Sequence, residues 1–381
     1  MKPGTRFLTL LSGLIILAGS VNLHAAQDDS IRINQIQIIG THNSYHAGLG
    51  TSEMKLLQQR DMRSAAALDY SHPRLADQLS AGIRQIELDV FADPHGGRFA
   101  RPDIAERVAA ARLPPDRDFD PDHEMDQAGF KVMHMQNIDQ RSRCHLFVRC
   151  LQEVRAWSKA HPRHLPIFIL VEYKTTYSTR PNGAITAEHV TPELFDALDK
   201  EVLSVFSRPE IITPDQVRGH HANLHEAIGT GGWPTLATAR GRIVLLLDNR
   251  DLAFTYAQGH PALNGRILFP NADPSSPDAA FTELNDGTPA QIGPLVKQGY
   301  LVRTRADFDT IQARSNNPRR RDEAIASGAQ IVSTDYPASE PARWTGYSVA
   351  FPGQRMTQCN PVNAPPACEN DKLEVVPATK P

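Results

Sequence analysis

Residues able to carry out acid–base or metal chemistry stand at the ends of short apolar runs in this sequence. Seven of eight such runs lead directly into ionisable or amide side chains. A single histidine after a strand is usually a core or surface residue, but packing alone does not explain seven such positions. The positions are His42 with Asn43, Glu87 with Asp89, His134, Glu172 with Lys174, Asp248, Arg303 with Arg305, and Asp335.

The spacing of the acidic residues indicates a metal ion. Residues two apart on a strand point to the same face, so Glu87 and Asp89 point together. Two neighbouring carboxylates repel each other unless a cation or a proton lies between them. Calcium, which takes about six to eight oxygen ligands, suits such a group. The oxygens available to it belong to Asn43, Glu87, Asp89 and Glu172. One alternative stays open, in which the two acidic residues form ion pairs with arginine or lysine.

Two histidines are left over for proton transfer. His42 and His134 each follow an apolar run, as the acidic residues do. Imidazole is the side chain most often used in general acid–base catalysis. We therefore assign proton transfer and charge stabilisation to these two residues.

The elements that must position these side chains form a repeating pattern. The apolar runs lie at residues 36–39, 83–88, 130–133, 167–171, 243–247, 267–269, 300–302 and 330–332. Helix-like segments between them include residues 75–79, 148–160, 192–206 and 319–327. This alternation predicts an α/β fold, a closed (β/α)8 TIM-type barrel, whose strands end at one shared mouth. An open doubly wound sheet is disfavoured because no G-x-G-x-x-G follows the first run.

We expect a single folded domain. Residues 1–26 are assigned to a signal peptide, residues 27–352 to the barrel and residues 353–381 to a Pro-rich tail. Two long insertions, residues 91–129 and 175–240, interrupt the alternation of strands and helices.

The first 26 residues have the features of a secretory signal peptide. Lys2 and Arg6 precede an apolar run at residues 7–19, which is too short to span a bilayer. Small residues at Ala25 and Ala26 suit cleavage at that point. We expect an exported protein, periplasmic or secreted, whose mature chain begins near Ala26.

The cysteines are consistent with export. The four of them allow three pairings, and an oxidising compartment favours disulfides. The pairs closest in sequence are Cys144 with Cys150 and Cys359 with Cys368.

The overall charge gives no reason to propose a nucleic-acid partner. The net charge is −3, and nucleic-acid binders usually carry a basic face. The basic cluster at residues 319–321 is short and is interpreted as a surface turn. We expect a monomer that binds no nucleic acid and makes transient contact with a membrane surface.

The motifs together resemble the catalytic set of the calcium-dependent phosphoinositide-specific phospholipases C, within the phospholipase C-like phosphodiesterases. The bacterial secreted branch of that family is the most similar. The resemblance runs from about residue 34 to residue 340. The segments that carry it are Thr41-His42-Asn43-Ser44-Tyr45, Glu87-Leu88-Asp89, His134 and Glu172-x-Lys174.

The resemblance implies an enzyme that cleaves phosphatidylinositol-type lipids to diacylglycerol and a cyclic inositol phosphate. It implies that His42 stabilises charge on the phosphoryl oxygens and that His134 protonates the leaving alkoxide. The substrate's own 2-hydroxyl attacks phosphorus. The implied calcium ligands are Asn43, Glu87, Asp89 and Glu172, one carboxylate also serving as base. The implied substrate contacts are Lys174, Arg303, Arg305 and Asp335.

Two other functions share parts of the pattern. Glycerophosphodiester phosphodiesterases have this barrel and an E-x-D pair, but they usually open with His-Arg-Gly where this chain has His42-Asn43-Ser44. A non-catalytic secreted barrel that binds a metal or ligand is the other alternative, and the presence of both histidines and all three carboxylates favours an enzyme. The family's second lysine, two residues after Lys174, is absent, which weakens the expectation of polyphosphorylated headgroups.

Overall fold

The structure is a computed structural model that describes residues 27–175 and 186–374. The expected signal peptide, part of the second insertion and the last residues of the tail lie outside the described residues. Among the described residues, no helix is both long and apolar enough to cross a bilayer.

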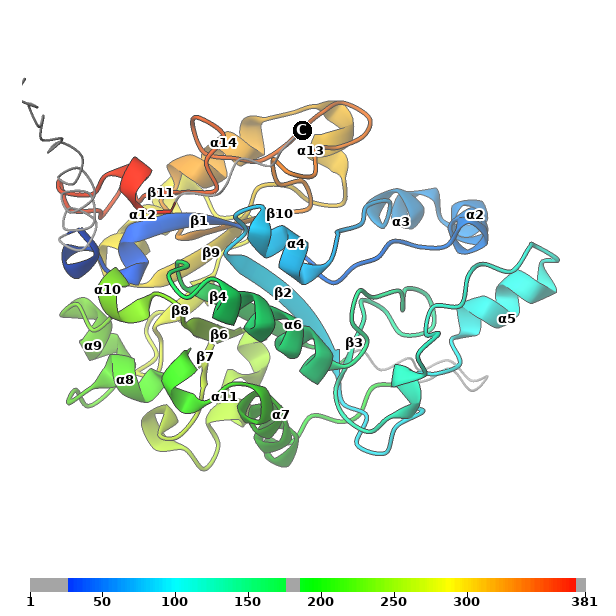
Figure 1. The fold of residues 1–381 in the computed structure, drawn as a ribbon, viewed down its shortest axis with the longest axis horizontal. Coiled ribbons are helices and arrows are strands. Elements are labelled where there is room, and N and C mark those ends of the chain that lie inside the picture. Colours follow the sequence, from blue (N-terminus) through cyan, green and yellow to red (C-terminus); the bar gives the residue numbers. More distant parts are fainter. Residues whose placement is uncertain (1–26, 176–185, 375–381) are drawn as a thin grey trace, which may run out of the picture.

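Eight parallel strands form the barrel at the centre of the molecule (Figure 1). Each strand pairs with the next around the ring, and the last pairs with the first: β1 (Ile36–Thr41), β2 (Gln85–Phe91), β4 (Ile167–Tyr173), β6 (Ile243–Leu247), β7 (Leu268–Pro270), β8 (Phe281–Glu283), β9 (Leu301–Arg305) and β10 (Ile331–Thr334). A parallel bridge between Asn271 and Phe281 joins β7 to β8. The Asn271 side chain supports this join by accepting a hydrogen bond from the Glu283 N–H at 3.0 Å. The predicted (β/α)8 fold is confirmed.

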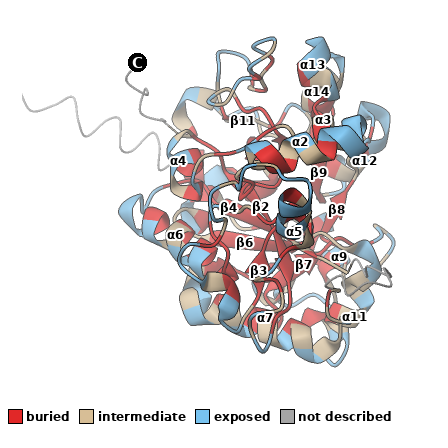
Figure 2. Cartoon of the chain, turned by 90° about the vertical axis from the view of Figure 1, so that its right-hand side faces the viewer, coloured by how far each residue is buried: buried red, intermediate tan, exposed pale blue. Residues whose placement is uncertain are grey.

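Apolar sequence explains why these segments are strands. All residues of β6, Ile-Val-Leu-Leu-Leu, are buried, as are all but Glu172 in β4. Parallel barrel strands are covered on both faces, so they carry continuous Ile, Val and Leu runs. Figure 2 shows the strands as a buried centre, surrounded by helices whose outer faces are exposed.

One predicted barrel strand is wrong and another was missed. The run at residues 130–133 forms only β3 (Lys131–Val132), which pairs antiparallel with β2 and takes no place in the ring. The ring position belongs to β8, where only three residues are extended. Two alanines precede that strand and an acidic residue ends it, so it shows no apolar run. A short strand, β5 (Ile211–Ile212), also pairs with β6.

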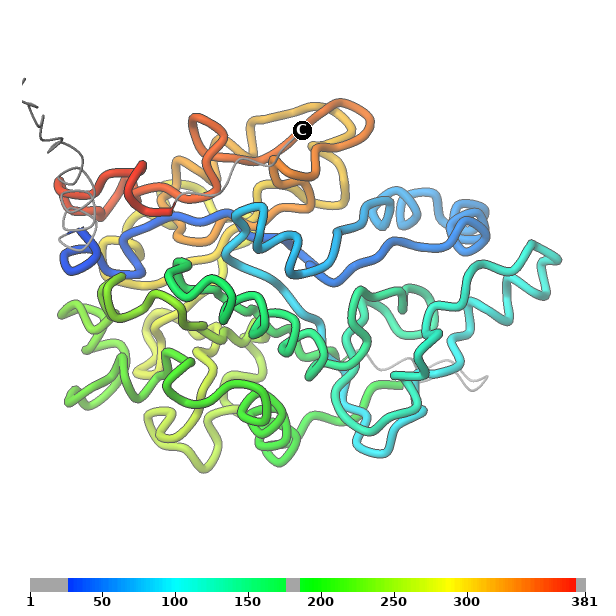
Figure 3. The backbone as a smooth tube through the Cα atoms, in the orientation of Figure 1, coloured from blue at the N-terminus to red at the C-terminus, as the bar shows by residue number. Residues whose placement is uncertain are grey.

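The predicted helices are confirmed within two residues, as α4 (Leu75–Ser80), α6 (Phe147–Ala160), α7 (Pro192–Val205) and α14 (Arg319–Ala326). Other α-helices in the described part of the chain are α2 (Thr51–Arg60), α3 (Met62–Ala67), α5 (Asp103–Ala110), α8 (Pro214–Arg218), α9 (Leu224–Gly229), α10 (Leu236–Ala239), α11 (Ala253–Ala257), α12 (Pro289–Lys297) and α13 (Ile311–Ser315). Short 3-10 turns lie at Ile33–Gln35, Glu124–Asp126, Arg208–Glu210, Arg250–Leu252, Pro261–Leu263 and Asn370–Lys372. In Figure 3 the α2–α3 segment and the segment that carries α5 extend from the same end of the molecule.

Two disulfides brace the barrel, and both join cysteines that are local in sequence, as expected. Cys144 pairs with Cys150 and Cys359 pairs with Cys368. The second lies in the tail, where β11 (Thr357–Cys359) pairs antiparallel with β1. Residues 353–374 therefore pack on the barrel and are not a free extension.

Candidate active site

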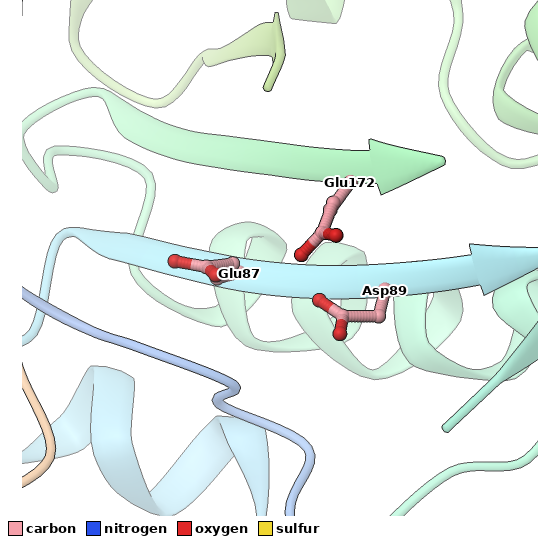
Figure 4. A group of neighbouring side chains, drawn as sticks. All are labelled: Glu87, Asp89 and Glu172. Atoms are coloured by element: carbon pink, nitrogen blue, oxygen red, sulfur yellow. The ribbon is translucent and has the colours of Figure 1, made fainter. Parts of the chain in front are cut away.

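The three acidic residues predicted to bind a metal converge at the barrel mouth (Figure 4). Glu87 and Asp89 lie on β2, and Glu172 lies on β4, where the strand register sets it opposite Asp89. One oxygen from each of the three carboxylates can be chosen so that all lie within 4.8 Å of one another. Parallel pairing of two strands thus brings together residues far apart in the sequence.

This group fits calcium. Ligands at about 2.4 Å from one ion lie no more than about 4.8 Å apart, as these oxygens do. Both oxygens of Asp89 are buried; Oδ1 has no hydrogen-bond donor among the described residues, and Oδ2 faces the Lys174 ammonium. Asn43 stands in the turn after β1, whose Ser44 N–H donates to the Glu87 carbonyl at 3.1 Å. Its side chain donates to the Tyr70 hydroxyl at 3.0 Å.

Cationic side chains also contact these carboxylates, so the ion-pair alternative is present in the structure. The Lys174 ammonium lies 2.7 Å from Asp89 Oδ2 and 2.9 Å from Glu172 Oε1. Arg303 binds Glu87 through one nitrogen and lies 3.4 Å from Glu283 through another. A metal ion would compete with Lys174 and Arg303 for the carboxylates of Glu87, Asp89 and Glu172.

Burial and crowding of negative charge shift the titration of this group. Burial, followed by the Asp89 charge, raises the pKa of Glu172 to about 7. Burial also raises the pKa of Glu87, although Arg303 opposes the shift. Burial disfavours the Lys174 ammonium, but Asp89 and Glu172 outweigh it and raise the lysine's pKa. A nearby positive charge therefore stabilises the ionised form of these carboxylates.

Two further carboxylates belong to this region: Asp248, which was expected at the barrel mouth but was given no role, and Glu283, which was not expected there. Glu283 ends β8, and Asp248 follows β6. Both raise the pKa of Arg303, against the effect of its burial. The sequence offered a signal for Asp248, since it ends an apolar run. Glu283 was missed because its strand was missed.

His42 is held by a carboxylate from the neighbouring strand. Its Nδ1 lies 2.8 Å from Asp335 Oδ1, and its Nε2 lies 3.8 Å from Glu87. The Asp335 backbone N–H donates to Asp307 at 2.9 Å, which fixes the loop after β10. Burial, followed by the charge of Arg305, lowers the pKa of His42. Asp335, expected to contact substrate, thus contacts a catalytic candidate directly.

His134 is held in a similar way by a residue that was not predicted. Its Nδ1 lies 3.0 Å from Asp139 Oδ2, and the buried His46 Nε2 lies 2.9 Å from the same oxygen. Burial opposes the charge on Asp139, but the two histidines keep the pKa of this carboxyl below its usual range. Asp139 stands five positions after His134 in a loop, and no regular pattern in the sequence marked it.

The two histidines open into one cavity of about 540 Å³. Arg305 and Asp335 line it beside them, and residues of α2 and α3 form its opposite wall. Arg303, by contrast, is almost completely buried beneath the carboxylates. The structure therefore brings all the predicted site residues to one end of the barrel, with Arg305 in the cavity and Arg303 in the floor.

Comparisons with known proteins found solved structures similar to this chain. One solved structure with the same fold is a calcium-dependent phosphoinositol-specific phospholipase C from a Gram-negative bacterium, Pseudomonas sp., with 16% identity, a TM-score of 0.50 and coverage of 87% of this chain and 96% of that one. Another match is a Ca²⁺-dependent phosphatidylinositol-specific phospholipase C from Streptomyces antibioticus, with 18% identity, a TM-score of 0.48 and coverage of 80% and 95%. No curated protein sequence was found to match.

The family profile covers most of the chain. The profile described as "Phosphoinositide phospholipase C, Ca2+-dependent" matches residues 31–361, which include every strand of the barrel and every predicted site residue. The chain belongs to the family of calcium-dependent phosphoinositide phospholipases C.

Proposed function

We propose that the protein cleaves phosphatidylinositol-type lipids by intramolecular attack of the inositol 2-hydroxyl on phosphorus. The new bond joins that oxygen to phosphorus, and the bond from phosphorus to the diacylglycerol oxygen breaks. The hydroxyl proton leaves to a base, and the departing alkoxide receives a proton. The products are diacylglycerol and a cyclic inositol phosphate. The observation that supports this proposal is the pair of carboxylate-held histidines in one cavity beside the acidic cluster.

Roles follow from the placement of each group. His134 is assigned as the general acid, with Asp139 fixing its ring and leaving Nε2 for the leaving oxygen. His42, near Glu87, is assigned to the developing charge on the phosphoryl oxygens. Arg305 and Lys174 are assigned to the substrate phosphate. The calcium ligands are assigned as Asn43, Glu87, Asp89 and Glu172, one carboxylate also accepting the hydroxyl proton.

Calcium held by Asn43, Glu87, Asp89 and Glu172 would supply positive charge that makes the attacking hydroxyl a stronger acid. Magnesium requires a tighter octahedral shell and is expected to substitute poorly.

Phosphorus NMR on phosphatidylinositol vesicles tests the reaction class. With calcium we expect a cyclic inositol phosphate signal, and chelation should abolish it reversibly. The His134→Ala variant, purified in the same way, controls for a contaminating phospholipase. No turnover of phosphatidylinositol, together with release of glycerol phosphate from glycerophosphoinositol supplied separately, would support a glycerophosphodiester phosphodiesterase. Full turnover in excess chelator would contradict the assigned metal site.

We also propose that the rim of the cavity rests on the lipid surface. Three large apolar side chains with unusual exposure lie around it: Met62 is 66% exposed, Ile311 54% and Met135 37%. Met135 lines the cavity, Met62 begins α3, and Thr310 ties the segment before Ile311 to α3 through a 2.8 Å hydrogen bond to Ala66. Exposed Arg60 and Arg63 on either side of Met62 suit anionic lipid headgroups.

Vesicle sedimentation tests this surface. A Met62→Ser, Ile311→Ser double variant should bind phosphatidylinositol vesicles several-fold more weakly, because less apolar area enters the interface. Turnover of a water-soluble inositol phosphate ester should be unchanged, which separates docking from catalysis. Unchanged vesicle binding would remove this rim as the docking surface.

The amino-terminal residues and the disulfides are consistent with an exported protein. We propose that the leader is removed near Ala26 and that both local disulfides form outside the cytoplasm. Intact mass measured without reduction should show a chain without residues 1–25 or 1–26 and without free thiols. Four free thiols would contradict it.

A further inference from the structure

The Lys174 ammonium lies within the group of oxygens assigned to calcium. It follows Glu172 by two positions at the end of β4, and its backbone N–H donates to the Val90 carbonyl at 2.9 Å. The lysine is therefore anchored on the barrel frame while its long side chain reaches back to Asp89 and Glu172. Both partners are candidate calcium ligands.

A calcium ion and this ammonium cannot use the cluster together. The three carboxylate oxygens lie within 4.8 Å of one another, and the ammonium is already 2.7 Å and 2.9 Å from two of the carboxylates. A divalent ion bound to the same carboxylates would lie within a few Å of the ammonium. Like charges at such a distance repel strongly in a partly desolvated site.

The second cation of the cluster is held differently. Arg303 contacts Glu87, Glu283 at 3.4 Å, Asn285 at 2.6 Å and Ser333 at 3.2 Å. These partners lie on or beside several strands, so together they fix the position of the guanidinium. The Lys174 ammonium has two carboxylate partners among the described residues, on a flexible four-carbon stem. Lys174 is thus the cation that is free to exchange.

We propose that Lys174 is a built-in competitor of calcium, whose ammonium neutralises the acidic cluster in the calcium-free protein and is displaced toward the substrate phosphate when calcium binds. This inference rests on the proposed calcium site. It makes calcium and substrate phosphate bind cooperatively, because the same event fills the metal site and frees a phosphate-binding cation. By linkage, phosphate binding must strengthen calcium binding by the same factor.

Calorimetric titration of calcium into metal-stripped protein tests the competition. Lys174→Met, which keeps the stem and removes the charge, should bind calcium at least about tenfold more tightly than the wild type, since one positive charge at the site is gone. Lys174→Arg keeps the charge and should not gain affinity. Lys159→Met is the control. Lys159 lies outside the site and its ammonium pairs with Glu210 at 2.8 Å, so this variant should bind calcium as the wild type does.

The coupling is tested with inositol 1-phosphate as the probe. Its dissociation constant in the wild type should fall several-fold on calcium saturation, and Lys174→Met should lose most of that change. Lysine acetylation mapped by mass spectrometry supplies a measurement on the wild type alone. Lys174 should be modified faster in calcium than in chelator, relative to Lys159, because its ammonium leaves the buried cluster.

The outcomes separate this inference from the proposed function. Calcium binding by the wild type with equal or weaker binding by Lys174→Met overturns the competition and leaves the calcium site standing. Acetylation of Lys174 that calcium does not change, or slows, overturns the displacement even if the variants fail to fold. A wild type that binds no calcium overturns both proposals.

Discussion

The two histidines of the site make similar contacts with an aspartate, but different parts of the fold position them. Their side chains are almost equally exposed, 19% for His42 and 20% for His134, and each Nδ1 lies about 3 Å from a buried aspartate. The regions around them differ. His42 is held by the barrel itself, and His134 is held by a loop.

On the His42 side, strand pairing sets the geometry. Thr41 pairs with Thr334 in the β1–β10 ladder, so the residues that follow them, His42 and Asp335, emerge side by side. The His42 N–H also donates to the Thr334 carbonyl at 3.1 Å. Arg305, from the next strand, lies 3.3 Å from Asp335 and adds a fixed positive charge.

On the His134 side, a two-residue strand and a loop set the geometry. β3 pairs antiparallel with β2 and returns the chain to the mouth, and Asp139 comes from the same loop as His134. His46 shares the Asp139 oxygen, and the disulfide between Cys144 and Cys150 closes the chain beyond it. The same imidazole–aspartate contact thus arises from a ladder in one place and from a braced loop in the other.

Removal of each imidazole should give the largest effects and should distinguish the two roles. His134→Ala should lose about 10²–10⁴-fold in rate on the natural lipid, and much less on a nitrophenyl ester of inositol phosphate, whose leaving group needs no proton. His42→Ala should lose activity to a similar degree on both substrates, because phosphoryl charge rises with either.

The measurement is the ratio of the two rate losses for each variant. Equal losses for His134→Ala on both substrates would remove it as the general acid. A loss confined to the lipid for His42→Ala would exchange the two roles.

Substitution of the two aspartates should give the next largest effects, and unequal ones. Asp335→Asn should lower kcat about 10²–10³-fold, because it leaves Arg305 uncompensated beside the imidazole, whereas Asp139→Asn should lower kcat about 10–10²-fold. Steady-state kinetics on the lipid measures both. A greater loss for Asp139→Asn would show that the loop carries more of the catalytic electrostatics than the barrel.

His46 contacts the same Asp139 oxygen as His134, so its removal should affect catalysis only through His134. His46→Phe keeps a ring but removes the donor to Asp139, and should lower the free energy of unfolding by about 1–3 kcal/mol in urea titration. Activity on the lipid should fall less than tenfold, and activity on the nitrophenyl ester should barely change. His46→Gln keeps an N–H donor and is the matched control. Equal loss on both substrates would place His46 outside the His134 side.

The two disulfides should give the smallest effect on activity and the clearest test of the loop. Replacing both cysteines of either pair by serine should cost about 2–3 kcal/mol of stability by chain entropy. Only the Cys144–Cys150 replacement should speed hydrogen exchange in the loop around His134 and lower activity at moderate temperature. The Cys359–Cys368 pair, in the tail beside β11, is the control. Faster hydrogen exchange around His42 in the Cys144–Cys150 variant would contradict the idea that the loop positions His134 independently of His42.

The part of the molecule built from regular strands could be predicted from the amino-acid sequence alone. Apolar runs ending in His42, Glu87, Glu172 and Arg303 predicted a barrel and its mouth, because buried parallel strands require such runs and all end on one side. The spacing of Glu87 and Asp89 predicted the acidic cluster for the same reason. The predicted site residues are brought together, and their roles in calcium and substrate binding remain proposals.

Several contacts in the site could not be predicted, because no periodicity in the sequence encodes them. β8 is a three-residue strand, too short to show a pattern, so Glu283 was not expected in the floor of the site. Asp139 reaches His134 through a loop, where no repeat links residue number to direction. The contact between Lys174 and Asp89 joins two strands, so it depends on their register and not on either sequence alone. The physical reason is the same throughout: local sequence sets which residues form a strand, and packing sets which strand ends meet.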